Sequence, residues 1–217
     1  MERRQQTVQR IEQCGVVAVI RLQDPDRLRG VIDALGAGGV TALEVTMTVP
    51  RAIQLIEAIA PALPADFVIG AGTILDPETA RAAILAGARF VVGPVFNRAV
   101  IDLCHRYDVA VMPGCFTPTE ILAAWEAGAD VVKVFPATAL GPAYFKDIRG
   151  PLPQVKLMPT GGVTLDNAGD WIAAGAVAIG AGTSMVDAKA VAAGDWAAIT
   201  RRAASFVEAV RRARGNG

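Results

Sequence analysis

The chain has 217 residues, and its 21 lysines and arginines balance its 21 aspartates and glutamates, so that its formal net charge is zero. This balance, without any long basic run, argues against a nucleic-acid partner or a polybasic membrane-binding surface. Hydrophobic residues make up 53% of the chain, but the longest uncharged run, residues 171–186, is rich in Ala and Gly and shorter than the roughly 20 apolar residues of a membrane span, so we expect no membrane partner.

The predicted elements alternate between helix and strand along the whole chain. The charged N-terminal segment lacks the apolar stretch of a secretory signal, and we expect a helix there. Strands are then predicted at residues 16–20, 42–46, 67–71, 89–92, 109–112, 130–135, 155–159 and 176–180. They begin roughly 20 to 26 residues apart, which leaves room for a helix and two loops between successive strands. Asp76-Pro77, Thr117-Pro118 and residues 165–167 mark helix starts.

Eight apolar strands that alternate with helices predict a parallel sheet covered by helices, because each crossover between parallel strands places a helix on a face of the sheet. The count of eight units predicts a single (β/α)8 barrel domain over residues 1–217, of the α/β class, at the small end of that fold's size range. A doubly wound open sheet is the alternative that the pattern leaves open.

The counts of histidine and cysteine limit the chemistry. The single histidine, His105, excludes a zinc or iron site built on several imidazoles of this chain, and its apolar helical surroundings predict a helix-surface residue. The three cysteines, Cys14, Cys104 and Cys115, form no CxxC pair and are odd in number. This usage predicts a reducing cytoplasmic location without a disulfide framework.

Lys133 is the outstanding polar residue within a predicted strand, in the run DVVKVFP over residues 130–136. In a barrel, alternate strand residues point inward and the active site lies at the C-terminal ends of the strands. Burial and a neighbouring cation both lower the pKa of a lysine, which makes the amine a nucleophile at neutral pH. A lysine that reaches solvent from the strand end, or that forms a structural ion pair, is the alternative of equal weight.

Glu44 is a second polar residue on an apolar strand, and its spacing places it on the same face as Ala42 and Thr46. Leu43 and Val45 then face the helices. A carboxylate inside the same barrel as a lysine could balance its charge or transfer protons. A buried ion pair without chemistry is the alternative, although such pairs rarely stabilise a protein.

Anion-binding candidates lie at the predicted C-terminal strand ends. Arg21 ends the first strand and Thr73 follows the third; an arginine fork or a threonine hydroxyl can bind an anionic group. Two glycine clusters follow the seventh and eighth strands, at residues 159–163 (PTGGV) and 180–184 (GAGTS). Their exposed N–H groups, with a helix start behind them, predict the phosphate site that barrels often carry at this place.

Together these residues give the chain a resemblance to the 2-keto-3-deoxy-6-phosphogluconate (KDPG) aldolases, which often also cleave 4-hydroxy-2-oxoglutarate (KHG). The matching motifs follow one another through nearly the whole chain and are specific as a set. They are VVAVIRL (16–22), GV (39–40), LEVT (43–46), GAGT (70–73), VGP (92–94), MPG (112–114), TPTE (117–120), KVFP (133–136) and PTGGV (159–163).

The resemblance implies a role for each matching residue. Lys133 would form the Schiff base with the 2-keto group, and Glu44 would be the general acid/base. The resemblance further implies a homotrimer in the cytoplasm that acts in sugar-acid breakdown. The remaining implied substrate-binding residues surround the pyruvate half (Thr73, Pro94, Phe135, Thr160) or hold the phosphate (Gly161, Gly162, Gly182, Thr183, Ser184).

Two positions depart from the family pattern. Some members carry a carboxylate-binding arginine where this chain has Thr48, and we assign the carboxylate to Arg21, which other members use. The frequent phosphate-loop serine aligns with Thr183, which keeps a hydroxyl, and Ser184 follows it.

The expected reaction is therefore a class I retro-aldol cleavage of a small phosphorylated 2-keto acid. It needs no metal or organic cofactor, because the protonated imine is the electron sink. Two alternatives stay open: a sugar-phosphate lyase, isomerase or epimerase, such as a 2-keto-3-deoxy-6-phosphogalactonate aldolase, and a non-catalytic barrel that serves as an assembly subunit.

Overall fold

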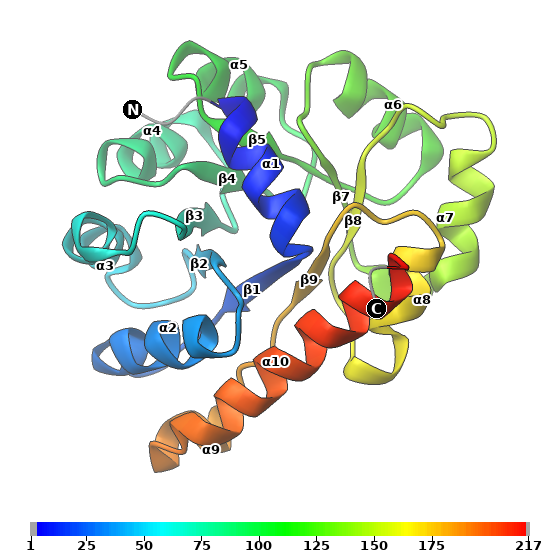
Figure 1. The fold of residues 1–217 in the computed structure, drawn as a ribbon. Helices are drawn as coiled ribbons and strands as arrows, with labels where there is room; N and C mark the ends of the chain where they lie inside the picture. The colour runs from blue at the N-terminus through cyan, green and yellow to red at the C-terminus, as the bar shows by residue number, and fades with distance from the viewer. Residues whose placement is uncertain (1–3, 216–217) are drawn as a thin grey trace.

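The computed structural model describes residues 4–215 as an arrangement of parallel strands surrounded by helices (Figure 1). The strands are β1 (Val16–Ile20), β2 (Ala42–Thr46), β3 (Val68–Gly72), β4 (Phe90–Val92), β5 (Ala110–Met112), β6 (Gly114–Cys115), β7 (Val132–Val134), β8 (Leu157–Pro159) and β9 (Ile179–Ala181). The helices are α1 (Arg4–Cys14), α2 (Leu28–Ala37), α3 (Ala52–Ile59), α4 (Pro77–Leu85), α5 (Arg98–Arg106), α6 (Pro118–Glu126), α7 (Pro142–Arg149), α8 (Leu165–Ala173), α9 (Ala188–Ala193) and α10 (Trp196–Ala213).

The strands form two parallel sheets. One sheet has the order β5-β4-β3-β2-β1-β9 and the other the order β6-β7-β8. Within the larger sheet β1 to β5 are neighbours in chain order, without the reversal that a doubly wound sheet shows. A single parallel bridge between Thr160 and Gly180 links the end of β8 to β9.

The predicted α/β class with a parallel sheet is confirmed, and the fifth predicted strand, 109–112, is present as β5. The short strand β6 was not predicted; Pro113 separates it from β5, and β5 pairs with β4 while β6 pairs with β7. Proline has no N–H to donate to a sheet ladder, which explains the break between the two segments. The expected N-terminal helix is present as α1; the predicted domain bounds include residues 1–3 and 216–217, which lie outside the described residues.

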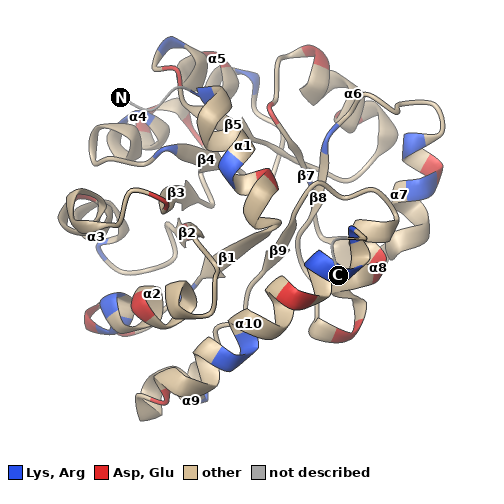
Figure 2. Cartoon of the chain, in the orientation of Figure 1, with Lys and Arg blue, Asp and Glu red and all other residues tan. Residues whose placement is uncertain are grey.

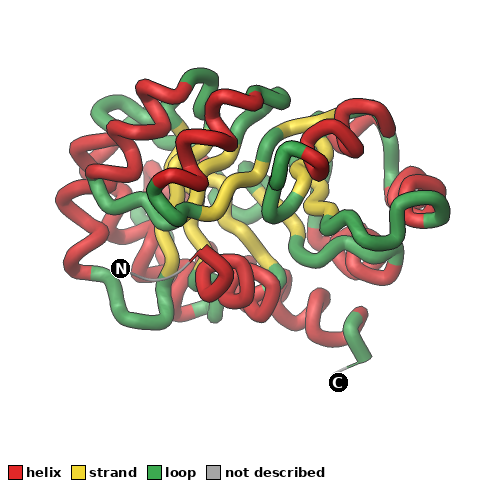
Figure 3. Tube along the Cα trace, turned by 90° about the horizontal axis from the view of Figure 1, so that it is seen from above, coloured by secondary structure: helices red, strands yellow, loops and turns green. Residues whose placement is uncertain are grey.

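The two faces of the strands pack against different layers. Leu43 and Val45 of β2 face outward into the large core beneath the helices, as the alternation predicts. Ala42 faces inward and belongs to a second apolar cluster together with Met112 and Met158. Figure 3 shows the strands in the interior and the helices outside them. Charged residues of both signs are spread over the outer helices (Figure 2).

Helix α1 lies across the end of the structure at which the strands begin (Figure 1). Its Val8 and Ile11 join the inner apolar cluster. Arg214, just after α10, holds this helix in place by donating hydrogen bonds to the carbonyl oxygens of Glu12 and Gln13 at distances of 2.7 and 3.1 Å. The interior is therefore covered at this end by α1, which also buries Thr7, and the other buried polar side chains of the described residues, Glu44, Thr46, Lys133 and Thr160, lie on the strands or directly after them. Among the described residues no helix is both long and apolar enough to cross a membrane.

Candidate active site

Lys133 and Glu44 form a buried ion pair inside the structure. Lys133 on β7 and Glu44 on β2 expose 3% and 0% of their side chains, and Lys133 Nζ lies 4.0 Å from Glu44 Oε1. The ammonium also lies over the ring of Phe135, 5.1 Å from its centroid. Neither carboxylate oxygen of Glu44 has a hydrogen-bond partner among the described residues. A buried carboxylate left in this state can exchange protons with a bound molecule.

The environment of Lys133 favours its neutral, nucleophilic form. Burial lowers the pKa of Lys133, and the positive charge of Arg21 lowers it further. The negative charge of Glu44 acts in the opposite direction and raises the pKa of this lysine, but the net shift is downward from 10.5. A buried amine with a lowered pKa is the usual form of a Schiff-base lysine.

Gly72 makes room for the Glu44 carboxylate. A Cβ atom at Gly72 would lie 2.0 Å from Glu44 Oε1, far closer than real Cβ contacts. In the parallel pairing of β2 and β3 Glu44 lies beside Gly70 and Thr46 beside Gly72, and the Glu44 carboxylate reaches the last residue of β3. The last position of β3, one residue beyond the predicted strand 67–71, therefore requires glycine because of this contact.

A short hydroxyl chain lies above Glu44 at the end of β2. Thr46 Oγ1 donates to the carbonyl oxygen of Ile20 at 3.1 Å, and Thr46 and Thr48 Oγ1 are 2.6 Å apart. Since the carbonyl can only accept, Thr48 is the donor to Thr46, and the exposed Thr48 oxygen keeps acceptor capacity. The sequence singled out Thr48 only as the position where some relatives have arginine.

A cavity of about 180 Å³ lies at the C-terminal ends of the strands; Phe135, over whose ring the Lys133 ammonium lies, lines it, whereas Lys133 and Glu44 do not. Its lining includes most of the predicted substrate-binding residues: Arg21, Phe135, Thr160, Gly161, Gly162, Gly182, Thr183 and Ser184. Arg21 lies beside the second glycine cluster, since a Cβ at Gly182 would lie 3.4 Å from Arg21 Nη1. The two predicted glycine clusters and this guanidinium therefore line one site.

Thr160 lies at the junction of this cavity with the buried interior. Its side chain is 3% exposed, and its Oγ1 has no hydrogen-bond partner among the described residues. Gly180 provides the space for it, because a Cβ there would lie 2.4 Å from Thr160 Oγ1. A buried hydroxyl without a partner costs free energy unless a ligand satisfies it.

Thr73 and Pro94 follow β3 and β4 at the same end of the structure, but neither lines this cavity. Thr73 adopts a left-handed backbone conformation with φ of 60°. Such a conformation is uncommon for a threonine and is often found at functional sites. The structure thus gathers the predicted residues at one end without bringing Thr73 and Pro94 to the glycine loops.

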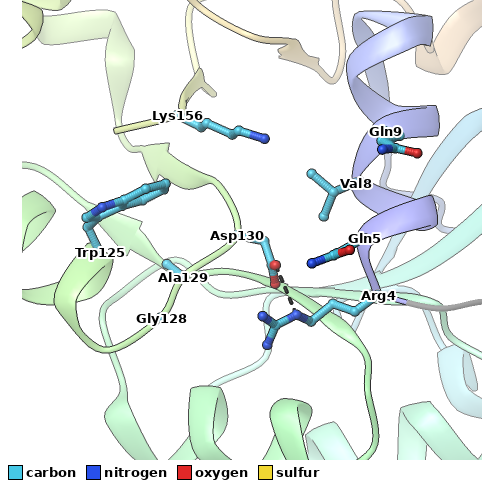
Figure 4. Close-up of a pocket in the computed structure, with 9 residues that line it drawn as sticks. All are labelled: Arg4, Gln5, Val8, Gln9, Trp125, Gly128, Ala129, Asp130 and Lys156. Carbon is cyan, nitrogen blue, oxygen red and sulfur yellow. Dashed lines mark ion pairs between the residues drawn. The ribbon is translucent and has the colours of Figure 1, made fainter. Parts of the chain in front are cut away.

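A larger cavity, of about 520 Å³, lies at the opposite end, between α1 and the segments that precede β7 and β8 (Figure 4). Its charged groups already have partners in the protein: Arg4 Nε lies 3.2 Å from Asp130 Oδ1, and Lys156 Nζ lies 2.6 Å from Glu12 Oε1. Its charged side chains are therefore paired with one another or with Glu12, and its other polar side chains are those of Gln5, Gln9 and Trp125. The described residues also contain no group of three or more His, Cys, Asp or Glu side chains that could hold a metal ion.

His105 lies outside both cavities. It is on α5, as predicted, but its side chain is half-buried, and its Nε2 contacts the carbonyl oxygen of Gly128 at 3.0 Å. The histidine therefore joins α5 to the loop before β7 and takes no part in the site.

Comparison with known proteins identifies close relatives. Residues 8–202 match the family model described as KDPG and KHG aldolase. The 2-dehydro-3-deoxy-phosphogluconate aldolase of Pseudomonas aeruginosa is 37% identical over 194 residues, 89% of this chain and 88% of the relative. The 2-dehydro-3-deoxy-6-phosphogalactonate aldolase of Escherichia coli is 36% identical over 200 residues, 91% of this chain and 95% of the relative.

A solved structure adds a chemical observation. The KDPG aldolase of Legionella pneumophila superposes with a TM-score of 0.85 and 29% identity, covering 92% of this chain and 97% of that one. In that structure, pyruvate was captured at low pH as a covalent carbinolamine intermediate. A carbinolamine is the adduct of an amine with a ketone, and it precedes a Schiff base.

Proposed function

The chain belongs to the KDPG and KHG aldolase family and is an aldolase, a carbon–carbon lyase, and from this premise we propose that it cleaves 2-keto-3-deoxy-6-phosphogluconate to pyruvate and glyceraldehyde 3-phosphate. A second reaction, the cleavage of 4-hydroxy-2-oxoglutarate to pyruvate and glyoxylate, uses the same pyruvate half. The buried pair of Lys133 and Glu44 carries this proposal, because it supplies an amine nucleophile and a proton-transfer group 4.0 Å apart.

We assign the covalent steps to Lys133. Its neutral amine adds to the C2 carbonyl of the substrate, and loss of water from the carbinolamine gives a protonated imine. When the C3–C4 bond breaks, its electron pair moves into the imine and leaves an enamine, while the C4 hydroxyl loses its proton. Protonation of C3 and hydrolysis of the imine then release pyruvate and restore the amine.

We assign the proton transfers to Glu44. Its carboxylate takes the proton from the C4 hydroxyl as the bond breaks and later helps to protonate the enamine carbon. The lack of a protein hydrogen-bond partner for either carboxylate oxygen supports this role. A positioned acid/base group of this kind contributes a factor of roughly 10² to 10⁴ to the rate.

The remaining residues bind the two ends of the substrate in this proposal. Arg21 binds the carboxylate, and Thr73, Pro94, Phe135 and Thr160 surround the pyruvate half. The phosphate binds the backbone N–H groups of the loops that contain Gly161, Gly162, Gly182, Thr183 and Ser184. Glycine turns and helix N-termini favour anions without a lysine, and residues 160–186 contain no lysine or arginine.

We also propose a single closed (β/α)8 barrel over the chain, acting as a homotrimer in the cytoplasm. The bridge between β8 and β9 supports closure at one edge. A trimer is supported by three large apolar side chains on the loops after β3, β4 and β6: Leu75, Val95 and Phe116 expose 55%, 53% and 39% of their surface. Light scattering coupled to size-exclusion chromatography tests the assembly: a monomer mass would contradict it.

Borohydride trapping tests the proposed function. Reduction in the presence of pyruvate should leave a stable adduct on the peptide that contains Lys133, as peptide mass spectrometry would show. An adduct on Lys146, Lys156 or Lys189 instead would contradict the assignment. The absence of any adduct, together with substrate turnover, would favour an isomerase or epimerase that uses Glu44 as a base without an imine.

The second candidate is a 2-keto-3-deoxy-6-phosphogalactonate aldolase, which the similarity to the Escherichia coli relative favours. The two substrates differ in configuration at C4, the carbon whose hydroxyl Glu44 deprotonates. Comparison of kcat/KM for the gluconate-derived phosphate, the galactonate-derived phosphate and 4-hydroxy-2-oxoglutarate decides between them.

A further inference from the structure

Side-chain hydrogen bonds from Asn167 and Ser184 hold the loop between β8 and α8. The role inferred for them below concerns the proposed phosphate site and rests on the proposed function. Gly161, Gly162, Val163 and Thr164 of this loop line the 180 Å³ cavity. The amide N–H groups of Gly162 and Val163 have no backbone acceptor among the described residues, whereas the Gly161 N–H faces Gly180 in the bridge between β8 and β9. Free N–H groups beside a helix start form an anion site only if something holds the peptides in the required orientation.

Asn167, in the first turn of α8, holds this loop with both ends of its side-chain amide. Its Nδ2 donates to the carbonyl oxygen of Gly162, and its Oδ1 accepts from the N–H of Thr164, each at 2.9 Å. Asn167 itself does not line the cavity. The loop is therefore fastened from the helix side, away from the space that a ligand would fill.

Ser184 holds the same loop from the second glycine cluster. Its Oγ donates to the carbonyl oxygen of Val163 at 2.7 Å. This bond uses the only hydroxyl hydrogen of Ser184, so that the hydroxyl cannot at the same time donate to a phosphate. The side chain of Ser184 thus joins the loop after β8 to the loop after β9.

Because the peptide bond is planar, these contacts with the carbonyl oxygens also determine where the neighbouring N–H groups point. In a trans peptide, the C=O of one residue and the N–H of the next point in opposite directions. The peptide between Val163 and Thr164 is bound at both ends, by Ser184 and by Asn167. The peptide between Gly162 and Val163 is bound at its oxygen by Asn167, so the N–H of Val163, a residue that lines the cavity, points away from Asn167.

We propose that Asn167 is a positioning residue of the phosphate site, and that it aims the Val163 N–H, together with the amide of Gly162, at a bound phosphate. Ser184 supports the same loop through its hydroxyl. Gly162 has a φ of +71°, and a Cβ atom there would lie 2.8 Å from Thr138 Cα, so only glycine fits at this point of the loop.

The test replaces Asn167 by alanine and measures phosphate binding directly. Isothermal titration with inorganic phosphate, and phosphate inhibition of pyruvate release from 4-hydroxy-2-oxoglutarate, should both show affinity at least about tenfold lower than in the wild type, the worth of a hydrogen bond to a charged group. KM for the phosphorylated keto acid should rise by a similar factor, while kcat/KM for 4-hydroxy-2-oxoglutarate stays within about twofold.

The matched control is Asn97→Ala. Asn97 caps α5 with the same pair of bonds, since its Nδ2 donates to the carbonyl oxygen of Leu75 at 2.9 Å and its Oδ1 accepts from the N–H of Ala99 at 3.0 Å. It lies away from the glycine loops, so its loss should lower the melting temperature about as much as Asn167→Ala and leave phosphate affinity unchanged. If Asn167→Ala does not fold, Ser184→Ala takes its place and should weaken phosphate binding severalfold.

Four results would overturn the proposal: unchanged phosphate affinity in Asn167→Ala, unchanged affinity in Ser184→Ala where that variant takes its place, an equal loss in the Asn97 control, or no phosphate binding by the wild type. Failure of the proposed function looks different. In that case the wild type would release no pyruvate from any of the keto acids, while the titration, which needs no catalysis, would still report whether phosphate binds and whether Asn167 supports it.

Discussion

Gly72→Ala is the sharpest probe of the geometry around the candidate acid/base. The added Cβ would lie 2.0 Å from Glu44 Oε1 and 2.6 Å from its Cδ and Cγ, where ordinary contacts begin at 3.4 Å. The side chain of Glu44 must therefore move by about 1.4 Å, and misplacement of a reacting group by about 1 Å can cost roughly 10²-fold in rate. We expect kcat for the phosphorylated keto acid to fall about 100-fold.

Two assays separate the steps in this variant. Pyruvate release, coupled to NADH oxidation by lactate dehydrogenase, reports turnover, and borohydride trapping with pyruvate reports imine formation at Lys133. Because the substitution moves Glu44 and leaves Lys133 in place, trapping should persist while turnover falls. The combination would show that the carboxylate, and not the amine, has been displaced.

Gly70→Ala is the matched control on the same strand. Its Cβ would lie 2.5 Å from the ring of Phe90, in the apolar interior, and not against a carboxylate. Overpacking of this kind costs about 1–3 kcal/mol of stability, so this variant should melt at a lower temperature but retain kcat within a few-fold. If Gly72→Ala keeps kcat within threefold of the wild type, or if Gly70→Ala loses as much, the reasoning about the Glu44 position is wrong.

Three further predictions concern the amine, the phosphate and metals. Burial lowers the pKa of Lys133 and the charge of Glu44 partly opposes this shift, so kcat/KM should fall as the pH falls through the lowered pKa. Glu44→Gln should move that inflection to lower pH and cut kcat by roughly 10² to 10⁴. A kcat within a few-fold of the wild type would show that Glu44 is only a charge partner of Lys133. Gly162→Leu should raise KM for the phosphorylated keto acid and barely change cleavage of 4-hydroxy-2-oxoglutarate; equal damage to both would show that the loop shapes the imine pocket instead. Prolonged chelation with EDTA should leave activity unchanged, and reversible loss would reveal a metal site.

The sequence located most of the strands because period-two alternation is a local signal. β1 and β2 match their predicted bounds, and the inward position of Glu44 on β2 follows from the alternation alone. The short strand β6 could not be read from the apolar pattern, since Met112, Pro113 and Gly114 form one continuous buried run. It depends on which neighbour each residue pairs with, a property of the assembled sheet.

The candidate site was predictable as a set of residues and not as a set of contacts. Lys133 stood out as a charge in an apolar run, and its pairing with Glu44 required only that both strands face the same interior. Thr46, at a strand end, and Asn167, at a helix start, occupy positions where polar residues are common. The sequence therefore does not single out the hydrogen bonds that they make. The sequence signal for Asn167 was its place three residues after Thr164, which is that of a capping box, but the carbonyl of Gly162 that it also holds is visible only in space.

The lowered pKa of Lys133 depends on packing at the end of the structure opposite the 180 Å³ cavity. A lowered pKa requires that water be kept from the amine on all sides, and below β7 this is done by the inner apolar cluster, to which Val131 and Met158 belong. That cluster would be open to solvent at the strand starts if Val8 and Ile11 of α1 did not cover it, and α1 is in turn held by Arg214. The N-terminal helix and the residue after α10 therefore support the reactivity of an amine near the opposite end, because the apolar interior between them excludes water only when both of its ends are covered.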